Sequence, residues 1–396
     1  MSIWLDVTTT LEWGRPVVGI VRVEAETARH FLRSGNPDVR FCRFDKAAGS
    51  YFKVAHDEIG TALTRLEAGG QPVQFQHTPE LPHILSRVAV QPFDAGDVYI
   101  SLGIDWDQKD MVLLYQLKQQ IKLKVLLFCY DIIPILLPQY CVTGVPDKFP
   151  KYFADAAWCA DKILCISDCS RIDLTNFLKS VGAPIPSLEV IRLGCDIFAE
   201  RNEQHADVVE AIKRHRFILF VSTIEGRKNH DILYRAYKYL LEKKHSDLPL
   251  LVFVGMQGWG VEKLMKDMRS DKRVGPFVRI LDHVSDNDLV CLYLNSMFTA
   301  YPSLYEGWGL PVAESLAYGK FCLASNAASI PEVGGDLIEY IDPRDEVAWA
   351  TRLLWYFHHP DSVAAREAEI VRRYRHTSWE QTGKDVMKFA ENLAAE

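Results

Sequence analysis

Short apolar runs alternate with longer amphipathic segments along almost the whole chain. The runs are rich in Val, Ile and Leu, and the segments between them space their apolar residues as helices do. Such runs are typical of parallel strands in a sheet that helices cover on both faces, so the pattern predicts an α/β protein. In the first half, strands are expected at Ile3–Val7, Val39–Phe44, Val98–Leu102, Lys124–Tyr130, Ile163–Ser167 and Leu188–Leu193. In the second half, they are expected at Phe217–Ser222, Leu250–Gly255, Val278–Leu281, Phe298–Tyr301, Phe321–Ala324 and Leu337–Tyr340.

The length of the chain predicts two domains. Its 396 residues are too many for one ordinary core, and domains of somewhat under about 200 residues are the natural division. A polar stretch, Arg201–Arg216, begins where one α/β pattern ends and stops where another starts, and we expect the linker there. The predicted domains are residues 1–200 and 201–377. A last helix at 378–396 can pack on either domain, including back on the first.

Two polar residues stand directly before amphipathic segments. Asn229 precedes HDILYRAYKYLLEKK, and Ser285 precedes DNDLVCLYLNS. Side chains of this kind accept hydrogen bonds from the unpaired N–H groups of a helix's first turn. We therefore expect both residues to cap helices.

Composition and charge exclude several classes of protein. Hydrophobic residues make up 48% and charged residues 24%, as in ordinary globular proteins, and the net charge of −7 argues against a dedicated nucleic-acid binder. The N-terminus carries Asp6 and no long apolar region, so it does not resemble a secretion signal, and no apolar run is long enough to span a bilayer. The nine cysteines lack the paired spacing of a zinc site, and we expect buried, reduced thiols in a cytosolic protein.

The stretch YEGWGLPVAE, Tyr305–Glu314, follows an expected strand and precedes an amphipathic segment. Pro311 fits the first turn of a helix, which leaves the preceding residues in a loop. Gly307 and Gly309 remove side-chain bulk from that loop, so the N–H groups of Gly309 and Leu310 can approach a ligand. Since a helix N-terminus favours negative charge, this stretch predicts an anion site.

Two carboxylates flank the predicted anion site. Glu306 lies in the loop and Glu314 in the first part of the helix. A carboxylate binds phosphate poorly but accepts hydrogen bonds from the neighbouring hydroxyls of a sugar. The pair suits a ligand with hydroxyls at both ends and phosphates between them, which is the shape of a nucleotide-sugar. The alternative is that Glu314 only stabilises the helix and Glu306 is a solvated loop charge.

A basic pair lies at a second strand end. Arg227 and Lys228 follow the run FILFVS, where ligands bind in open parallel sheets. They can reach a phosphate in the same crevice, although adjacent basic residues are often merely solvated.

The second half of the chain resembles the retaining nucleotide-sugar glycosyltransferases called family 4, which have the GT-B fold. Glu306 and Glu314 match the family's E-x7-E motif within PSLYEGWGLPVAESLAYGK, and VSTIEGRKN is similar to GT-x-x-PRKN, with Gly226 where proline is usual. Further similar segments are LLVFVGMQGW, HVSDNDLVCLY, ASNAASIPEVGG and HTSWEQT. In the first half, RPVVGIVRVE, CYDIIPILLP and ILCISDCSRIDL match more loosely. The resemblance implies two Rossmann-like, doubly wound domains facing across a cleft, with the acceptor on the first and the nucleotide-sugar on the second.

The resemblance also implies roles for individual residues. Glu306 would contact the transferred sugar and Glu314 the ribose, whereas Arg227 and Lys228 would bind the diphosphate. Gly19 would let the first loop approach the diphosphate.

Two further residues keep two interpretations each. Asp131, in the segment similar to HDLIP, can orient the acceptor or the sugar, or it can be a turn residue. His283 can lie near the base, or it can be a structural histidine.

The implied reaction moves a hexose from a nucleotide-sugar with retention of configuration. We favour a GDP-mannose-type donor, because TTTLEW, RPVVGIVRVE and YDIIP resemble bacterial members that build surface polysaccharides. A UDP-sugar donor, a sugar-nucleotide epimerase or phosphorylase on the same fold, and a non-catalytic partner in polysaccharide assembly are the alternatives. We expect no cofactor and no metal, since basic residues serve the phosphates.

The implied acceptor is a glycan or a lipid-linked glycan, which predicts a cytoplasmic protein with peripheral membrane contact as an open alternative. One surface for such contact combines apolar and basic residues, although a helix facing the core explains them more simply. These residues are Leu113, Leu114, Leu117, Ile121, Lys118, Lys122 and Lys124.

Overall fold

The computed structural model describes residues 1–14, 17, 19–67, 91–196 and 205–396. These residues form two compact units. The first unit contains Met1–Ile135, Thr143–Gly194 and Thr377–Glu396, and the second contains Leu136–Val142 and Cys195–His376.

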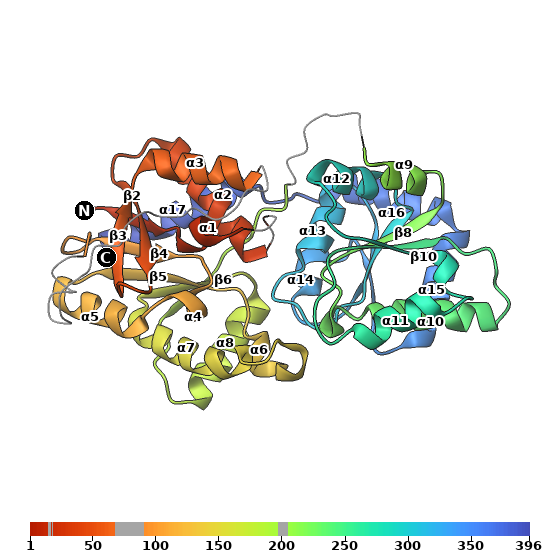
Figure 1. The fold of residues 1–396 in the computed structure, drawn as a ribbon, viewed down its shortest axis with the longest axis horizontal. Coiled ribbons are helices and arrows are strands. Elements are labelled where there is room, and N and C mark those ends of the chain that lie inside the picture. Colours follow the sequence, from red (N-terminus) through yellow and green to blue (C-terminus); the bar gives the residue numbers. More distant parts are fainter. Residues whose placement is uncertain (15–16, 18, 68–90, 197–204) are drawn as a thin grey trace. The chain divides into compact units, whose positions relative to one another are not determined.

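The first unit is built on a seven-stranded sheet with the order β3-β2-β1-β4-β5-β6-β7. The strands are β1 (Ile3–Asp6), β2 (Val39–Asp45), β3 (Ser50–Val54), β4 (Val98–Ser101), β5 (Lys124–Cys129), β6 (Lys162–Cys165) and β7 (Ser187–Val190). Helices cover both faces (Figure 1): α1 (Thr8–Glu12), α2 (Gly19–Ser34), α3 (His56–Glu67) and α17 (Trp379–Ala395) lie on one face. The other face carries α4 (Asp105–Gln108), α5 (Met111–Ile121), α6 (Ile133–Leu136), α7 (Val145–Cys159) and α8 (Asp168–Ser180).

The second unit is built on a six-stranded parallel sheet with the order β10-β9-β8-β11-β12-β13. The strands are β8 (Phe217–Val221), β9 (Leu250–Val254), β10 (Val278–Leu281), β11 (Phe298–Tyr301), β12 (Cys322–Ser325) and β13 (Glu339–Ile341). In Figure 1, α10 (His230–Glu242), α11 (Glu262–Ser270) and α15 (Glu346–His358) lie on one side of this sheet. The remaining helices are α9 (Asp207–Lys213), α12 (Asp286–Asn295), α13 (Leu310–Ala317), α14 (Ile330–Gly334) and α16 (Pro360–Arg373).

Both sheets confirm the predicted α/β class, and every expected strand is present with its ends within three residues of the prediction. The sequence pattern missed β3, which pairs antiparallel with β2 at the edge of the first sheet. The expected linker is only partly correct, because Asp207–Lys213 forms α9, which buries Val209 and Ile212. The linker's first residues, 201–204, lie outside the described part of the chain.

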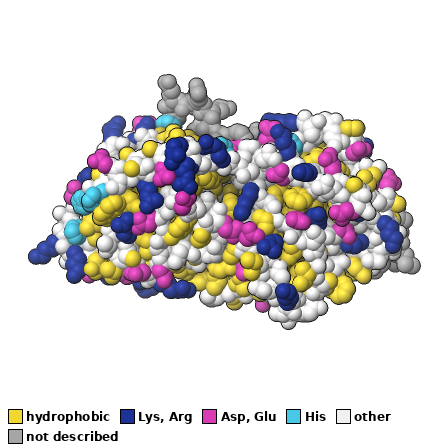
Figure 2. Space-filling model, turned by 180° about the vertical axis from the view of Figure 1, so that it is seen from behind, with side chains coloured by type: hydrophobic (Ala, Val, Ile, Leu, Met, Phe, Trp, Pro, Cys, Tyr) yellow, Lys and Arg dark blue, Asp and Glu magenta, His cyan; other side chains and the backbone are white. Residues whose placement is uncertain are grey.

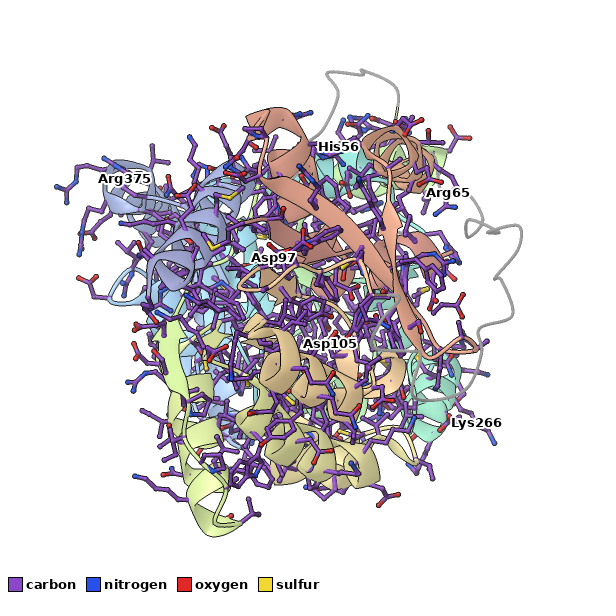
Figure 3. All side chains as sticks on the ribbon, turned by 90° about the vertical axis from the view of Figure 1, so that its left-hand side faces the viewer. His56, Arg65, Asp97, Asp105, Lys266 and Arg375 are labelled. Atoms are coloured by element: carbon purple, nitrogen blue, oxygen red, sulfur yellow. The ribbon has the colours of Figure 1, made fainter. Side chains whose placement is uncertain are left out.

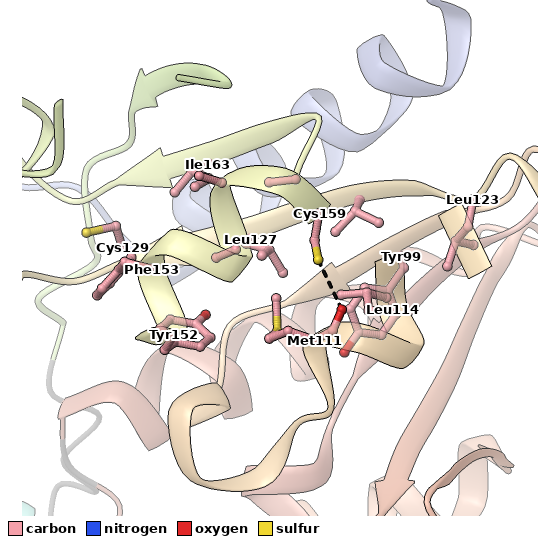
Figure 4. Close-up of a cluster of buried hydrophobic side chains, with 14 of the residues drawn as sticks. Tyr99, Met111, Leu114, Leu123, Leu127, Cys129, Tyr152, Phe153, Cys159 and Ile163 are labelled. Carbon is pink, nitrogen blue, oxygen red and sulfur yellow. Dashed lines mark hydrogen bonds between the residues drawn. The ribbon is translucent and has the colours of Figure 1, made fainter. Parts of the chain in front are cut away.

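The apolar residues of α5 were expected either to form a membrane-contact surface or to face the core. Leu113, Leu114 and Leu117 are buried between α5, α7 and the sheet, and Figure 4 shows Leu114 within this cluster. The thiol of Cys159 donates a hydrogen bond to the Met111 carbonyl at 3.1 Å, which joins the two helices. These leucines therefore face the core, as the simpler interpretation predicted.

The C-terminal helix belongs to the first unit. Helix α17 packs against α2, and a Cβ added at Gly383 would lie 2.6 Å from the side chain of His30. Lys124 donates to the carbonyl oxygens of Leu393 and Ala394. The chain therefore returns to its first unit after completing the second.

A short segment of the first half of the sequence belongs to the second unit. Leu136–Val142 includes a 3-10 helix, Pro138–Tyr140, and the carbonyl of Tyr140 accepts a hydrogen bond from Trp259 at 2.6 Å. The expected first domain, residues 1–200, therefore lacks this segment and the residues from Cys195 onward.

The surface and the cysteines agree with the composition. On the face seen in Figure 2, Lys and Arg lie among Asp and Glu rather than forming a basic stripe. The nine cysteines all lie in the described residues and none forms a disulfide, and all but Cys141 and Cys169 are buried. Among the helices of the described residues, none combines the length and the apolar character that crossing a bilayer requires.

Candidate functional site

The candidate site lies where the strand order of the second sheet reverses. Strands β8 and β11 are neighbours at this point, and both lead into loops at their carboxyl ends. Arg227 and Lys228 lie in a 3-10 helix, Gly226–Lys228, after β8, and Glu306 lies in the loop after β11. Ligands of open α/β sheets bind at such a reversal, so the topology itself brings the predicted residues together.

Glu306 forms ion pairs with both predicted cations. Its Oε2 lies 3.0 Å from Nη1 of Arg227, and its Oε1 lies 2.7 Å from Nζ of Lys228. All three side chains are largely buried, with 15% of Arg227, 14% of Lys228 and 8% of Glu306 exposed. The alternative that Glu306 is a solvated loop charge is therefore wrong.

Two hydroxyl groups complete the surroundings of Glu306. Ser303 donates to Oε1 at 2.5 Å, and Tyr301 donates to the same oxygen at 3.0 Å. Burial alone would raise the pKa of Glu306, but the charges of Arg227 and Lys228 and the hydrogen bonds from Lys228 and Ser303 outweigh it and lower the pKa to about 2. Glu306 is therefore ionised at neutral pH.

A second carboxylate, which the sequence analysis missed, also holds Arg227. Oε1 of Glu225 lies 2.7 Å from Nη2 of Arg227, and only 3% of the Glu225 side chain is exposed. The site thus contains two cations and two carboxylates in direct contact. The only sequence signal was an acid two positions before the arginine, a spacing that many surface turns also show.

The loop after β8 is fixed by neighbouring backbone. A Cβ added at Gly226 would lie 3.2 Å from the ring of Tyr140, so the glycine in place of the usual proline leaves room for this ring. Asn229 has a left-handed φ of 62° and makes no capping bond to α10. Its amide instead donates to the carbonyls of Pro302 and Pro343, which joins the β8 loop to the loops after β11 and β13. Its predicted capping role is therefore wrong. The predicted cap at Ser285 is confirmed, since its hydroxyl accepts from the Asp288 N–H.

The glycine-containing loop leads into α13 as predicted. Helix α13 begins at Leu310 with Pro311 in its first turn, and Gly309 precedes it with a φ of 109°, which a residue with a side chain rarely adopts. Gly307 is buried in the same loop. The hydroxyl of Ser329 donates to the carbonyls of Glu306 and Trp308 at 2.8 and 3.0 Å, which fixes the loop on α14's side.

Glu314 lies on α13 and is half-buried. Tyr293 donates to its Oε2 at 2.8 Å. The carboxylate also contributes, after burial, to raising the pKa of Tyr318 to about 12. Glu314 is therefore held by a hydrogen bond from Tyr293 of its own unit. Its predicted contact with a ribose stays a prediction.

The remaining predicted residues lie outside this charge cluster. His283 follows the edge strand β10, is exposed and has a left-handed φ of 53°. Gly19 and Asp131 belong to the first unit, where Gly19 begins α2 with a φ of 54°. Asp131 accepts a hydrogen bond from the N–H of Ile133 at 2.9 Å, as a turn residue does. The ligand roles of these three residues stay predictions.

The first unit has its own charge cluster at the reversal of its strand order, between β1 and β4. Oδ1 of Asp6 lies 2.5 Å from Nζ of Lys109, and Tyr99 donates to Oδ2 at 2.8 Å. Asp105, labelled in Figure 3, accepts from Ser101 at 2.6 Å, and Glu24 accepts from the N–H of Thr10 at 2.6 Å. Burial and the charge of Asp6 raise the pKa of Glu24 to about 8.

Comparison with known proteins places the second unit in a family. Residues 201–372 match the family described as Glycosyl transferases group 1. The O-antigen chain mannosyltransferase B of Escherichia coli is 28% identical over 63% of this chain and 66% of its own length. The D-inositol 3-phosphate glycosyltransferase of Salinispora tropica is 31% identical over 57% of this chain and 50% of its own length. The chain thus spans less than two thirds of these relatives.

Solved structures share the fold along the whole chain. Sucrose-phosphate synthase from Thermosynechococcus elongatus has a TM-score of 0.65 and 15% identity, covering 100% of this chain and 99% of its own. HepE from Anabaena, solved in complex with UDP, has a TM-score of 0.63 and 16% identity, covering 99% and 100%. The two units therefore have the GT-B type of α/β fold.

Proposed function

Because residues 201–372 form a glycosyl transferase group 1 domain, we propose that this chain is a retaining glycosyltransferase. It moves a hexose from a nucleotide-sugar, with a GDP-mannose-type donor favoured, to a glycan or lipid-linked glycan in polysaccharide biosynthesis. Nucleotide-sugar and acceptor are substrates, and the reaction needs no cofactor.

The contact of Glu306 with Arg227 and Lys228 at the strand reversal is the observation that supports this proposal most strongly. Two cations at the carboxyl ends of neighbouring strands suit a diphosphate. An ionised carboxylate between them suits the hydroxyls of the attached sugar. An ordinary surface ion pair would be neither buried nor located at the reversal of the strand order.

In the proposed reaction, the bond between the anomeric carbon and the diphosphate oxygen breaks, and the acceptor oxygen bonds to that carbon on the same face. The departing oxygen takes the proton of the incoming hydroxyl. Arg227, Lys228 and the N-terminus of α13 stabilise the charge that develops on the nucleoside diphosphate. Leaving-group stabilisation therefore supplies most of the rate.

Binding requires the cations to exchange partners. Both are bonded to Glu306, so a diphosphate that takes hydrogen bonds from Arg227 and Lys228 also loosens their hold on this carboxylate. Donor binding in this proposal therefore turns Glu306 from an ion-pair partner into an acceptor for sugar hydroxyls.

The mannosyl preference rests on relatives. The relatives of this chain include the E. coli O-antigen chain mannosyltransferase B. They also include the E. coli serotype-specific mannosyltransferase WbdA, which is 29% identical over 24% of its own length. Since these matches are partial, donor and acceptor are proposals for this chain, and UDP-sugars are the second candidates.

A screen of nucleotide-sugars by thermal shift tests the proposal. A donor that binds the folded state raises the Tm with increasing concentration. We expect GDP-mannose or a related GDP-sugar to raise the Tm, and labelled sugar to pass from it to a glycan acceptor. No shift with any GDP- or UDP-sugar would contradict the proposal, and conversion of the donor without an acceptor would favour an epimerase.

Metal independence is part of the proposal, because the phosphate site is basic. Transfer should continue at the same rate in EDTA. Loss of transfer in EDTA, restored by Mg²⁺ or Mn²⁺, would contradict this part.

A further inference from the structure

We propose that Glu225 is a positioning residue that holds Arg227 in place and limits how tightly the site binds a nucleoside diphosphate. The inference rests on the proposed function of the same site. It starts from the contact between Oε1 of Glu225 and Nη2 of Arg227, at 2.7 Å, with 3% of Glu225 and 15% of Arg227 exposed.

Arg227 is held from three directions. Nη2 bonds to Glu225, whereas Nη1 bonds to the carbonyl of Tyr305 at 2.6 Å and lies 3.0 Å from Glu306. Because Glu306 and the Tyr305 carbonyl occupy the same amino group, a phosphate can replace one of them while Nη2 stays on Glu225. The guanidinium is then still oriented when its other half turns to the ligand.

The backbone beneath Glu225 is also fixed. The N–H of Ile224 donates to the carbonyl of Met256 at 2.9 Å, and the N–H of Gly258 donates to the carbonyl of Ile224 at 2.9 Å. The N–H of Lys228 donates to the carbonyl of Glu225 at 3.1 Å. Glu225 therefore lies on a braced turn, and its carboxylate can hold the arginine without help from solvent.

The charges explain why Glu225 also limits affinity. Arg227 and Lys228 carry two positive charges, and Glu225 and Glu306 carry two negative charges within direct contact. An incoming diphosphate must compete with Glu306 for both cations, and the negative charge of Glu225 opposes its approach. A site with Glu306 alone would bind the diphosphate more tightly and would release it as a product more slowly.

The test is calorimetric titration of the full chain with GDP, UDP and inorganic pyrophosphate. Glu225→Gln keeps the shape and an oxygen that accepts from Nη2, but it removes one negative charge. We expect it to bind at least one of these probes about fivefold or more tightly at low salt, because the net charge of the buried cluster becomes positive. The gain should shrink as salt rises.

Glu339→Gln is the matched control. Glu339 also pairs with an arginine of the second unit, Arg352, and accepts from Tyr356 at 2.7 Å, but it lies on β13 away from the site. This variant should bind the probes within about twofold of wild type, since its charge is remote from the cluster. A purely structural role for Glu225 would weaken binding in E225Q, so tighter binding separates the two explanations.

Unchanged or weaker binding in E225Q, with a Tm close to that of wild type, would overturn the inference. If E225Q does not fold, Glu225→Asp serves instead: it keeps the negative charge, but its shorter side chain withdraws the carboxylate from Nη2, so it should bind the probes more weakly than wild type. Equal or tighter binding in E225D would then overturn the inference. If wild type binds none of the probes, the proposed function fails together with the inference. If wild type binds but E225Q does not bind more tightly, only the inference fails.

Discussion

The two units carry charge clusters at the same topological position, but the clusters differ in their ratio of basic to acidic side chains. In the second unit, Arg227 and Lys228 meet two carboxylates, and Glu306 has its pKa lowered to about 2. In the first unit, Lys109 is the buried cation beside Asp6, Asp105 and Glu24, and the pKa of Glu24 is raised to about 8. Both clusters lie where the strand order reverses.

This difference shows that the shared sheet topology provides a position but not a chemistry. The second cluster has two cations for two carboxylates, so a phosphate can replace a carboxylate as the partner of these cations. In the first, one cation serves several acids that bond to the threonines and serines of their own loops. We therefore assign the first cluster to holding α1 and α4 in place, and the second to binding.

The largest expected effect breaks the first cluster. Lys109→Ala leaves Asp6 buried without its cation, and removing one partner of a buried pair typically costs about 3–5 kcal/mol. Chemical denaturation should show this loss in the unfolding of the first unit. Lys118→Ala, at a half-buried pair with Asp161, is the control and should cost about 1 kcal/mol or less. Equal losses in the two variants would contradict the structural role.

The next effect concerns activity and breaks the second cluster. Lys228→Ala removes one donor to the departing diphosphate, which should reduce transfer about a hundredfold or more, with the fold retained. Lys320→Ala is the control, since Lys320 pairs with Glu367 in the same unit at 2.8 Å but lies outside the site. Initial rates with saturating donor measure the effect. A K228A rate within about threefold of wild type would refute the assignment.

Much of the fold could be predicted from the sequence because parallel strands are continuous apolar runs. Strand β3 was missed because Ser50–Val54 is short and includes a serine and a lysine, and α9 because its 7 residues are too few to show a helical period within a polar stretch. The registers and the return of α17 to the first unit depend on contacts between distant segments, which no local pattern contains.

The candidate site divides in the same way. Glu306, Arg227 and Lys228 were predictable because each directly follows a strand or a turn signal. Glu225, Ser303 and Tyr301 were not, since their role is visible only once the β8 and β11 loops lie together. The cluster around Lys109 was missed because its acids are dispersed over β1, α2 and α4, and burial alone gives them their character.

A smaller effect is expected on the stability of the second unit at acid pH. Glu306 has a folded pKa of about 2, below its ordinary value, so its ion pairs stabilise the fold above about pH 4.5. That contribution, on the order of 2–3 kcal/mol, should be lost as pH falls from about 4.5 towards about 2. Denaturation between pH 6 and 3 should show a steeper loss in wild type than in Glu306→Gln. Parallel pH profiles would contradict the ionised state.

The last predicted effect has the opposite sign and belongs to the first cluster. Glu24 has a folded pKa of about 8, above its ordinary value, so the folded unit keeps a proton that the unfolded chain releases. Stability should therefore fall as pH rises between about 4.5 and 8, by on the order of 4–5 kcal/mol. Glu24→Gln, which imitates the protonated side chain, should lack this slope. If the variant follows wild type between pH 5 and 8, Glu24 is not protonated in the fold.

The most direct test is a crystal structure of the protein with GDP-mannose or GDP bound. The account predicts phosphate oxygens within hydrogen-bonding distance of Arg227 and Lys228 at the β8 and β11 strand ends, with Glu306 directed at the sugar hydroxyls in the GDP-mannose complex. A nucleotide bound elsewhere, with Glu306 still paired to both cations, would contradict it.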